Sequence, residues 1–300
     1  MAIWRIHLNT EAEQGYDVSK FCIENNFVGI GWLANTTEAA SLSLEKYKEL
    51  IKEAGHDSTS WRKAINAMES MAVNDIVWTR NNSSGVYYLG RITDEWRYYG
   101  HKEYDIGSIR KCEWYEVGRL EKVAGTIVNN FIGGATVQRV YSDTVERFSK
   151  ITYNEKSNSD HYEVDKLLKE DIFKLLAWDD CEDVLAIYLQ TERGYYLIPS
   201  TCKKSAPLYE YELINAKNGK RAGVQVKSGI DDASLDIDKY LEESMDVYLF
   251  APNGTHGKYG KFYGTKENVT TIDPEEIRKI LYERTDLLPK KIQVWVDMTR

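Results

Sequence analysis

The sequence has few of the features that place a chain in a specialised class. Its 300 residues contain four cysteines, Cys22, Cys112, Cys181 and Cys202, whose wide separation shows no paired metal-ligand spacing. We therefore expect reduced and mostly buried thiols in a cytoplasmic protein. The N-terminal stretch has neither a basic start nor an apolar core, and no long apolar run occurs later. Secretion and membrane spanning are not expected.

A basic excess is also missing. The formal net charge is −8 and neither half of the chain is basic, so charge alone does not point to nucleic acid. A nuclease is still compatible with this charge, because enzymes with carboxylate-bound metals are locally acidic and need only a positive stripe. Aromatic residues are abundant, with 8 Trp and 21 Tyr. The composition indicates a globular protein of one or two domains with a sizeable core.

The first half has the pattern of a small mixed β domain. Apolar runs predict seven strands, and helical spacing behind cap residues such as Asp17 and Ser58 or Thr59 predicts three early helices. We expect a curled sheet or barrel into which these helices are inserted. The expected strands cover residues 3–8, 27–33, 75–79, 86–92, 96–99, 112–117 and 135–140, and the expected helices residues 18–24, 44–54 and 61–71.

Short motifs in this half carry a resemblance to a known superfamily. A Trp-containing opening strand, GIGW at residues 29–32, DIVW at residues 75–78 and GRI at residues 90–92 resemble the EVE and YTH members of the PUA-like superfamily. The resemblance covers about residues 1–140. It implies a small β-barrel whose aromatic pocket accepts a flipped nucleobase, often a modified one. Gly29 and Gly31 are expected to let another backbone or a ligand come close.

Three tryptophans and two asparagines are the candidate residues for such a pocket. An extruded base needs flat apolar walls for stacking and a few polar groups for its edge. Trp32, Trp61 and Trp78 are the candidate walls. Asn81 and Asn82 are the candidates for reading an edge. The alternative for each tryptophan is a core position, since its side chain buries a large area.

A polar stretch separates the two halves. Residues 142–160 end in a run rich in Ser, Asn and Lys, and this composition is typical of a linker. We place the domain boundary near residue 155, which gives a base-recognition domain over residues 1–155 and a second domain over residues 156–300. The second domain is expected to open with a helix at residues 162–176.

The second half predicts a different order of elements. A helix that begins at Asp180 carries Glu182 and Asp183 in its first turn, where acidic side chains also favour the positive end of the helix dipole. A strand bent at Pro199 follows it, and Asn218-Gly219 marks a hairpin turn. The remaining expected elements are a helix at residues 235–244, strands at residues 247–251 and 292–296, and a helix that begins at Asp273.

The hairpin gathers acidic and basic side chains on one sheet face. Strand alternation places Glu210 and Glu212 together on the first strand, and Gln225 and Lys227 together on the second. Pairing symmetric about Asn218-Gly219 sets Glu212 opposite Gln225 and Glu210 opposite Lys227. Carboxylates bind Mg²⁺, which activates water against a phosphodiester, and an ammonium stabilises the developing charge. The alternative is a solvated face with ordinary cross-strand ion pairs.

The order helix, three strands, helix, strand resembles the αβββαβ core of the PD-(D/E)xK nuclease superfamily over about residues 175–255. The resemblance implies a metal site formed by Glu210 or Glu212 with Gln225, and a catalytic role for Lys227. Glu182 or Asp183 would supply the further acid that many members carry on the first helix. Two departures stand out, because Glu replaces the usual Asp on the second strand and Gln225 replaces the acid on the third. The Gln225 carbonyl oxygen can still bind a cation or position water.

Together the two resemblances imply two domains of α+β and α/β class, a PUA-like barrel followed by a restriction-endonuclease-like core. The expected function is that of a modification-dependent, type IV-like restriction endonuclease in phage defence, which flips a modified base of DNA into its pocket and cleaves the backbone with Mg²⁺. A double-strand break needs two catalytic domains, so a homodimer is expected. The alternative is a non-catalytic reader of modified DNA or RNA whose nuclease-like half is degenerate.

Overall fold

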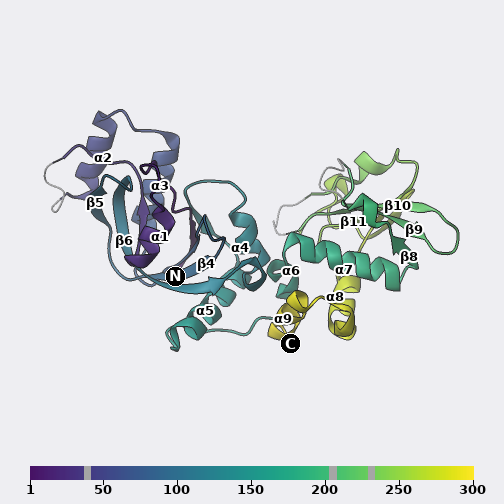
Figure 1. Ribbon diagram of the computed structural model, residues 1–300. Helices are drawn as coiled ribbons and strands as arrows, with labels where there is room; N and C mark the ends of the chain where they lie inside the picture. Colours follow the sequence, from purple (N-terminus) through teal and green to yellow (C-terminus); the bar gives the residue numbers. More distant parts are fainter. Residues whose placement is uncertain (37–41, 203–207, 229–233) are drawn as a thin grey trace. The chain divides into compact units, whose positions relative to one another are not determined.

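The computed structural model describes residues 1–36, 42–202, 208–228 and 234–300. The chain forms two compact units (Figure 1). The first comprises Met1–Val123 with Asn130–Asp165, and the second comprises Ala124–Asn129 with Lys166–Arg300. Each unit contains one sheet and several helices, so the fold is mixed α and β.

The first unit is built on a curled, half-barrel sheet of seven strands. The strand order is β2-β6-β4-β3-β1-β7, with β5 paired to β6 off this path. The long strand β6 curls the sheet, because it pairs with β2, β4 and β5 along its length. Each strand expected in this half is present, although β6 begins well before residue 112. The bounds are β1 (Ile3–Ile6), β2 (Phe27–Ile30), β3 (Ile76–Arg80), β4 (Tyr87–Ile92), β5 (Arg97–His101), β6 (Ile106–Gly118) and β7 (Val137–Val140).

The three early helices form where their caps predict them. They are α1 (Val18–Glu24), α2 (Leu44–Glu53) and α3 (Thr59–Ser70). The Asp17 carboxylate accepts a hydrogen bond from the Lys20 N–H, and the Ser58 hydroxyl oxygen accepts one from the Trp61 N–H. Each bond satisfies a backbone donor that the first helical turn leaves free.

The stretch that we expected to be a linker is a helix of the first unit. Helix α5 (Asp143–Ser157) begins behind Ser142 and ends at Asn158, which adopts the left-handed conformation. Its buried face alternates short polar residues with a few large ones, including Phe148 and Ser149. Composition suggested a linker because Ser, Thr and Asn are frequent in loops, but small hydroxyl side chains also fit closely against a sheet. The helix packs on β1, β4 and β6.

The second unit is built on a six-stranded mixed sheet. The strand order is β12-β13-β11-β10-β9-β8, in which β8, β9 and β10 are antiparallel neighbours and β10, β11 and β13 run parallel. Helix α7 (Trp178–Thr191) lies across this sheet and packs on β8 and β10 (Figure 1). The bounds are β8 (Tyr195–Leu197), β9 (Tyr211–Asn215), β10 (Arg221–Val226), β11 (Asp246–Phe250), β12 (Gly264–Lys266) and β13 (Val269–Thr271).

Several expected elements of this unit differ from the structure. The helix at residues 162–176 reduces to a 3₁₀ turn (Lys169–Asp171) and α6 (Ile172–Leu175), and that at residues 235–244 to a 3₁₀ turn (Ile237–Tyr240). Residues 292–296 lie in helix α9 (Lys290–Met298) rather than in a strand. Their run of apolar residues also fits a helix, in which Ile292, Trp295 and Val296 share the buried face.

Helix α8 (Pro274–Glu283) begins behind Asp273, as predicted, and α4 (Gly125–Asn130) precedes β7. The Asp273 carboxylate accepts a hydrogen bond from the Glu275 N–H. Among the described residues no helix has both the length and the apolar character that crossing a bilayer requires. The four cysteines are free thiols, of which only Cys202 is exposed.

Candidate functional site

Two of the three candidate pocket tryptophans lie in the core. The Trp78 side chain is fully buried, its ring stacks on Phe148 at a centroid distance of 5.9 Å, and its Nε1 donates to the Ser149 hydroxyl at 2.9 Å. Trp61 is 1% exposed and faces inward from α3. Neither indole presents a face to a ligand. The expectation that they form pocket walls is therefore wrong, and the core alternative holds for both.

The two asparagines also differ in environment. Asn81 is buried, and its side chain holds the β3–β4 turn together: Nδ2 donates to the Ser19 hydroxyl at 3.0 Å, and Oδ1 accepts from the Ser84 N–H at 2.8 Å. Both ends of its amide are therefore occupied, which argues against a base-reading role. Asn82 is exposed and lines a cavity.

Trp32 lines a separate cavity of about 420 Å³ in the first unit. The polar residues around it come from four segments: Asn9, Thr10 and Glu11 follow β1, His56 follows α2, Asp105 precedes β6 and Thr136 precedes β7. The sequence analysis did not identify Asp105 or His56 as candidate residues. The only local signal that could have identified Asp105 is its position directly before the Ile-Gly pair that opens β6. The neighbouring sequence does not predict that β6 begins there.

Two non-glycine residues of this cavity adopt the left-handed backbone conformation. Trp32 has φ 66° and Asp105 has φ 46°. This conformation is uncommon for a bulky residue and marks sites where the surrounding structure imposes the geometry. The Tyr47 hydroxyl donates to the Trp32 carbonyl at 2.7 Å and helps to hold it. The backbone that carries the indole is thus held in place before any ligand arrives.

Glycines make this arrangement possible. A Cβ atom added at Gly107 would lie 2.2 Å from the Trp32 carbonyl oxygen, and one added at Gly31 would lie 2.8 Å from Asp105 Oδ2. A larger residue at Gly107 would collide with the Trp32 backbone, and one at Gly31 would require the Asp105 side chain to move. The expectation that Gly31 allows a close approach is therefore confirmed, and the neighbour is the Asp105 side chain.

The Asp105 carboxylate is the main charged group of the cavity. It is half-buried, and its Oδ2 accepts a hydrogen bond from the Glu11 N–H at 3.1 Å. Burial raises the pKa of Asp105, and the nearby Glu11 carboxylate acts in the same direction, against the Glu11 N–H bond and the charge of His56. A ring bound against Trp32 would meet hydrogen-bond acceptors at its edge, which suits a ligand with amino or ring N–H donors.

In the second unit the hairpin has a different register from the expected one. Glu212 lies opposite Gly223 and Tyr211 opposite Val224, which brings Gln225 to Glu210. The shift arises in the turn, because the Asn215 carboxamide oxygen accepts hydrogen bonds from the Lys217 and Asn218 N–H groups and forms a four-residue loop. Gly219, with φ 70°, closes this loop rather than occupying its centre.

Glu210, Gln225 and Glu182 form the closest group of predicted site residues. Gln225 Nε2 donates to Glu210 Oε1 at 2.5 Å, and both side chains are half-buried. Glu182 comes from the second turn of α7, beside the Tyr211 hydroxyl that donates to its carbonyl oxygen. Burial, followed by the negative charge of Glu210, raises the pKa of Glu182 to about 7. Two carboxylates thus lie in one partly buried region, where their negative charges repel each other. A bound cation would reduce this repulsion.

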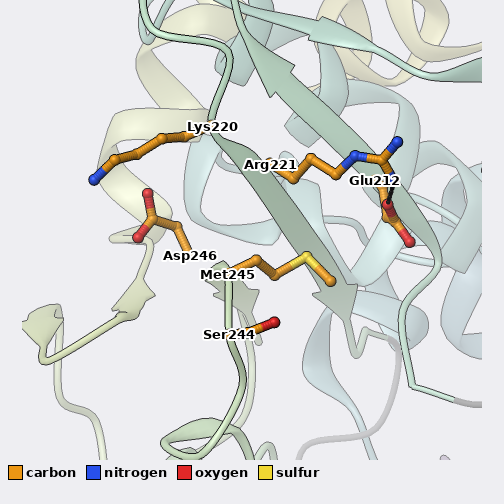
Figure 2. Close-up of a pocket in the computed structure, with 6 residues that line it drawn as sticks. All are labelled: Glu212, Lys220, Arg221, Ser244, Met245 and Asp246. Atoms are coloured by element: carbon orange, nitrogen blue, oxygen red, sulfur yellow. Dashed lines mark hydrogen bonds and ion pairs between the residues drawn. The ribbon is translucent and has the colours of Figure 1, made fainter.

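Glu212 belongs to another part of the hairpin. Its Oε2 forms an ion pair with Arg221 Nη1 at 3.1 Å (Figure 2). The two residues line a cavity of about 450 Å³ at the start of β10, together with Lys220, Ser244, Met245 and Asp246. Figure 2 shows Lys220 and Asp246 on one side of this cavity and the Arg221–Glu212 pair on the other. The structure therefore associates Glu210, and not Glu212, with Gln225.

Asp183 is likewise engaged elsewhere. Lys291 of α9 reaches the first turns of α7, where its Nζ lies 2.7 Å from Asp180, 3.0 Å from Asp179 and 3.6 Å from Asp183. Burial alone would lower the pKa of Lys291, but the hydrogen bonds that its ammonium donates to Asp180 and Asp179 outweigh this effect and raise that pKa. Asp180 is not the N-cap that we expected; it lies within the first turn and accepts from the Ala177 N–H at 3.0 Å.

Lys227 follows directly after β10. Its N–H donates to the Phe250 carbonyl at 2.9 Å, which extends the pairing with β11, and its side chain is exposed. Glu182, Glu210 and Gln225 offer two carboxylates and one amide oxygen, which are hard oxygen donors of the kind that Mg²⁺ prefers. Within the described part of the chain, no group of three or more His, Cys, Asp or Glu side chains is placed to hold a metal ion.

Comparison with known proteins gives one match. A family model described as a domain of unknown function (DUF8426) matches residues 4–140. The matched region extends from β1 to the end of β7 and includes Trp32 and Asp105. Neither a curated protein nor a solved structure matches the chain.

Proposed function

We propose that the protein is a modification-dependent endonuclease, in which the first unit binds a modified base of DNA and the second hydrolyses the backbone with Mg²⁺. The observation that carries this proposal is the meeting of Glu182, Glu210 and Gln225 on a sheet in which α7 precedes three antiparallel strands and a fourth, parallel strand, with a 3₁₀ turn in place of the second helix of the αβββαβ pattern. A type IV-like role in phage defence, a PUA-like first unit and a PD-(D/E)xK second unit belong to the same proposal.

The Trp32 cavity supports the base-binding part. It combines one fixed indole with acceptor groups at its edge, and its volume of about 420 Å³ is within the range of small-molecule sites. A flipped base needs such a stacking surface and a few polar contacts. Of the five residues that the sequence suggested, Trp32 remains in this cavity and Asn82 in the neighbouring one, and Asp105 is added to them.

The side chains of the second unit have separate tasks in hydrolysis. Glu210 and Glu182 supply anionic oxygens for the cation, and the Gln225 amide, which donates to Glu210, fixes that carboxylate. Bound Mg²⁺ polarises the phosphoryl oxygen and makes a bound water more acidic. The Lys227 ammonium stabilises the negative charge that develops on the phosphate. Cutting both strands requires a second copy of the chain, so the proposal includes a homodimer on DNA.

Plasmid cleavage tests this proposal. With Mg²⁺, the wild-type protein should cut DNA that contains 5-methylcytosine, 5-hydroxymethylcytosine or N6-methyladenine and leave unmodified DNA intact. Lys227→Ala should reduce the cleavage rate by about 100-fold or more while binding is retained. Lys220→Ala is the matched control, because this lysine lies at the other end of β10 and should have little effect. Undiminished cutting by Lys227→Ala would show that the site is wrong, and equal cutting of all DNAs would exclude dependence on modification.

A reader without cleavage activity is the second candidate. It is favoured by the metal-ligand set, which contains two acids and an amide where a third acid is usual. Specific binding of modified DNA by a wild-type protein that cuts none of the substrates would establish this alternative.

A further inference from the structure

A second cavity adjoins the Trp32 cavity in the first unit. It also has a volume of about 420 Å³, and Asn9 and Thr10 line both. The second cavity lies where the chain after β1 approaches α1 and the β3–β4 turn, and its other lining residues include Tyr16, Asn82 and Ser83. Two hollows that share one wall are suited to two linked groups of one ligand.

Tyr16 supplies an exposed aromatic ring to this cavity. Its side chain is 43% exposed. The ring is braced from within, because it packs edge to face with Tyr104 at 4.8 Å, and Tyr104 stacks on Phe21 at 3.8 Å with the planes only 12° apart. A braced ring loses little freedom when a ligand stacks on it, and base stacking on aromatic side chains is sequence-tolerant.

Asn82 supplies the unengaged polar group. Its neighbours have their side chains satisfied: Asn81 bonds to Ser19 and Ser84, and the Ser83 hydroxyl donates to Asp17 at 2.8 Å. In the portion of the chain that the structure describes, the Asn82 carboxamide makes no hydrogen bond. It therefore offers both a donor and an acceptor from a turn whose backbone the adjacent residues hold in place.

We propose that the second cavity binds the nucleotide next to the one whose base enters the Trp32 cavity. Tyr16 stacks on this neighbouring base and Asn82 hydrogen-bonds to its edge, so the site prefers certain flanking bases. Asn9 and Thr10 line both cavities, so neighbouring nucleotides of one DNA strand could occupy the two sites. The inference rests on the proposed base-binding function.

Fluorescence anisotropy with short single-stranded DNA tests the inference. The probes contain one modified base of the three kinds named above, with each of the four bases in turn at the flanking position. Tyr16→Ala should weaken binding of the best probe about tenfold whichever base flanks the modification. Asn82→Ala should reduce the spread of affinities among the four flanking bases. Both residues are exposed, so unchanged melting temperatures are expected to accompany these losses.

Two comparisons make the outcomes distinct. Tyr141→Ala removes a more exposed tyrosine that lines neither cavity and should leave affinity unchanged. Trp32→Ala should abolish discrimination between modified and unmodified probes. If Trp32→Ala has this effect while Tyr16→Ala and Asn82→Ala bind as the wild type does, the second site is excluded and the base-binding function stands. Failure of the wild-type protein to bind any probe would overturn both.

Discussion

The two candidate sites are held in place by different forces. In the first unit the Trp32 cavity has its shape before a ligand binds, because left-handed backbone at Trp32 and Asp105 and the absence of side chains at Gly31 and Gly107 fix it. In the second unit the carboxylates of Glu182 and Glu210 repel each other, and a cation at the proposed site would reduce this repulsion. The comparison teaches that shape is built into the first site, whereas charge governs the second.

The ion pairs around the second site also show how charge distinguishes its acidic residues. Lys291 forms ion pairs with three aspartates of α7, and Arg221 pairs with Glu212. These acids already have a cationic partner, so they gain less from a metal ion. Among the residues that the structure describes, Glu182 and Glu210 are the predicted site acids that form no ion pair, which is why the proposal assigns the metal to them.

The largest effect should separate the tryptophans of the first unit. Trp78→Ala removes a fully buried ring and its hydrogen bond to Ser149, and should lower the free energy of unfolding by about 3–5 kcal/mol. The Trp32 indole is only partly buried, although it also packs against the core, so Trp32→Ala should lower stability less than Trp78→Ala does and should reduce affinity for modified DNA by at least about tenfold. Urea unfolding and fluorescence anisotropy measure the two quantities. A strong loss of stability in Trp32→Ala would mean that the indole serves the core.

The next effect should separate the glutamates of the hairpin. Glu210→Ala removes a carboxylate from the proposed cation site and should lower the rate of Mg²⁺-dependent cleavage about 100- to 1,000-fold. Glu212→Ala breaks an exposed ion pair with Arg221 and should change the rate by less than about threefold. A larger effect of Glu212→Ala than of Glu210→Ala would support the pairing of Glu212 with Gln225 that the sequence suggested.

The smallest effect concerns the pH dependence of stability. Burial and Glu210 raise the pKa of Glu182 from 4.5 to about 7, so the folded state binds more protons than the unfolded state between these pH values. Stability should therefore decline as the pH rises through this window. Glu182→Gln should be more stable than the wild type at pH 8 by about 1 kcal/mol and equal to it near pH 4.

Thermal unfolding at both pH values measures this difference, with Glu212→Gln as the control. Addition of Mg²⁺ should raise the melting temperature of the wild type more than that of Glu182→Gln, since a bound cation stabilises the folded state. An equal gain for Glu182→Gln at pH 4 and pH 8 would show that the charge of Glu182 is not responsible.

The elements that follow local rules could be predicted from the sequence. Asp17, Ser58 and Asp273 cap the helices that they were expected to cap, because an N-cap bond joins residues two or three positions apart. The strands of the first unit follow from alternation, and the α7 helix from its apolar face. Helix α5 escaped prediction because its buried face uses short polar residues, which composition cannot tell from a loop.

The candidate residues themselves divide in the same way. The sequence by itself determined that Glu210, Gln225 and Lys227 lie around one hairpin and that Gly31 permits a close approach. Only the tertiary structure decided that Glu210 rather than Glu212 meets Gln225, that Trp32 rather than Trp61 or Trp78 lines the cavity, and that Asp105 joins it. Residue types set local hydrogen bonds and strand faces, whereas register, burial and ion pairing depend on partners that lie tens of residues away in the chain.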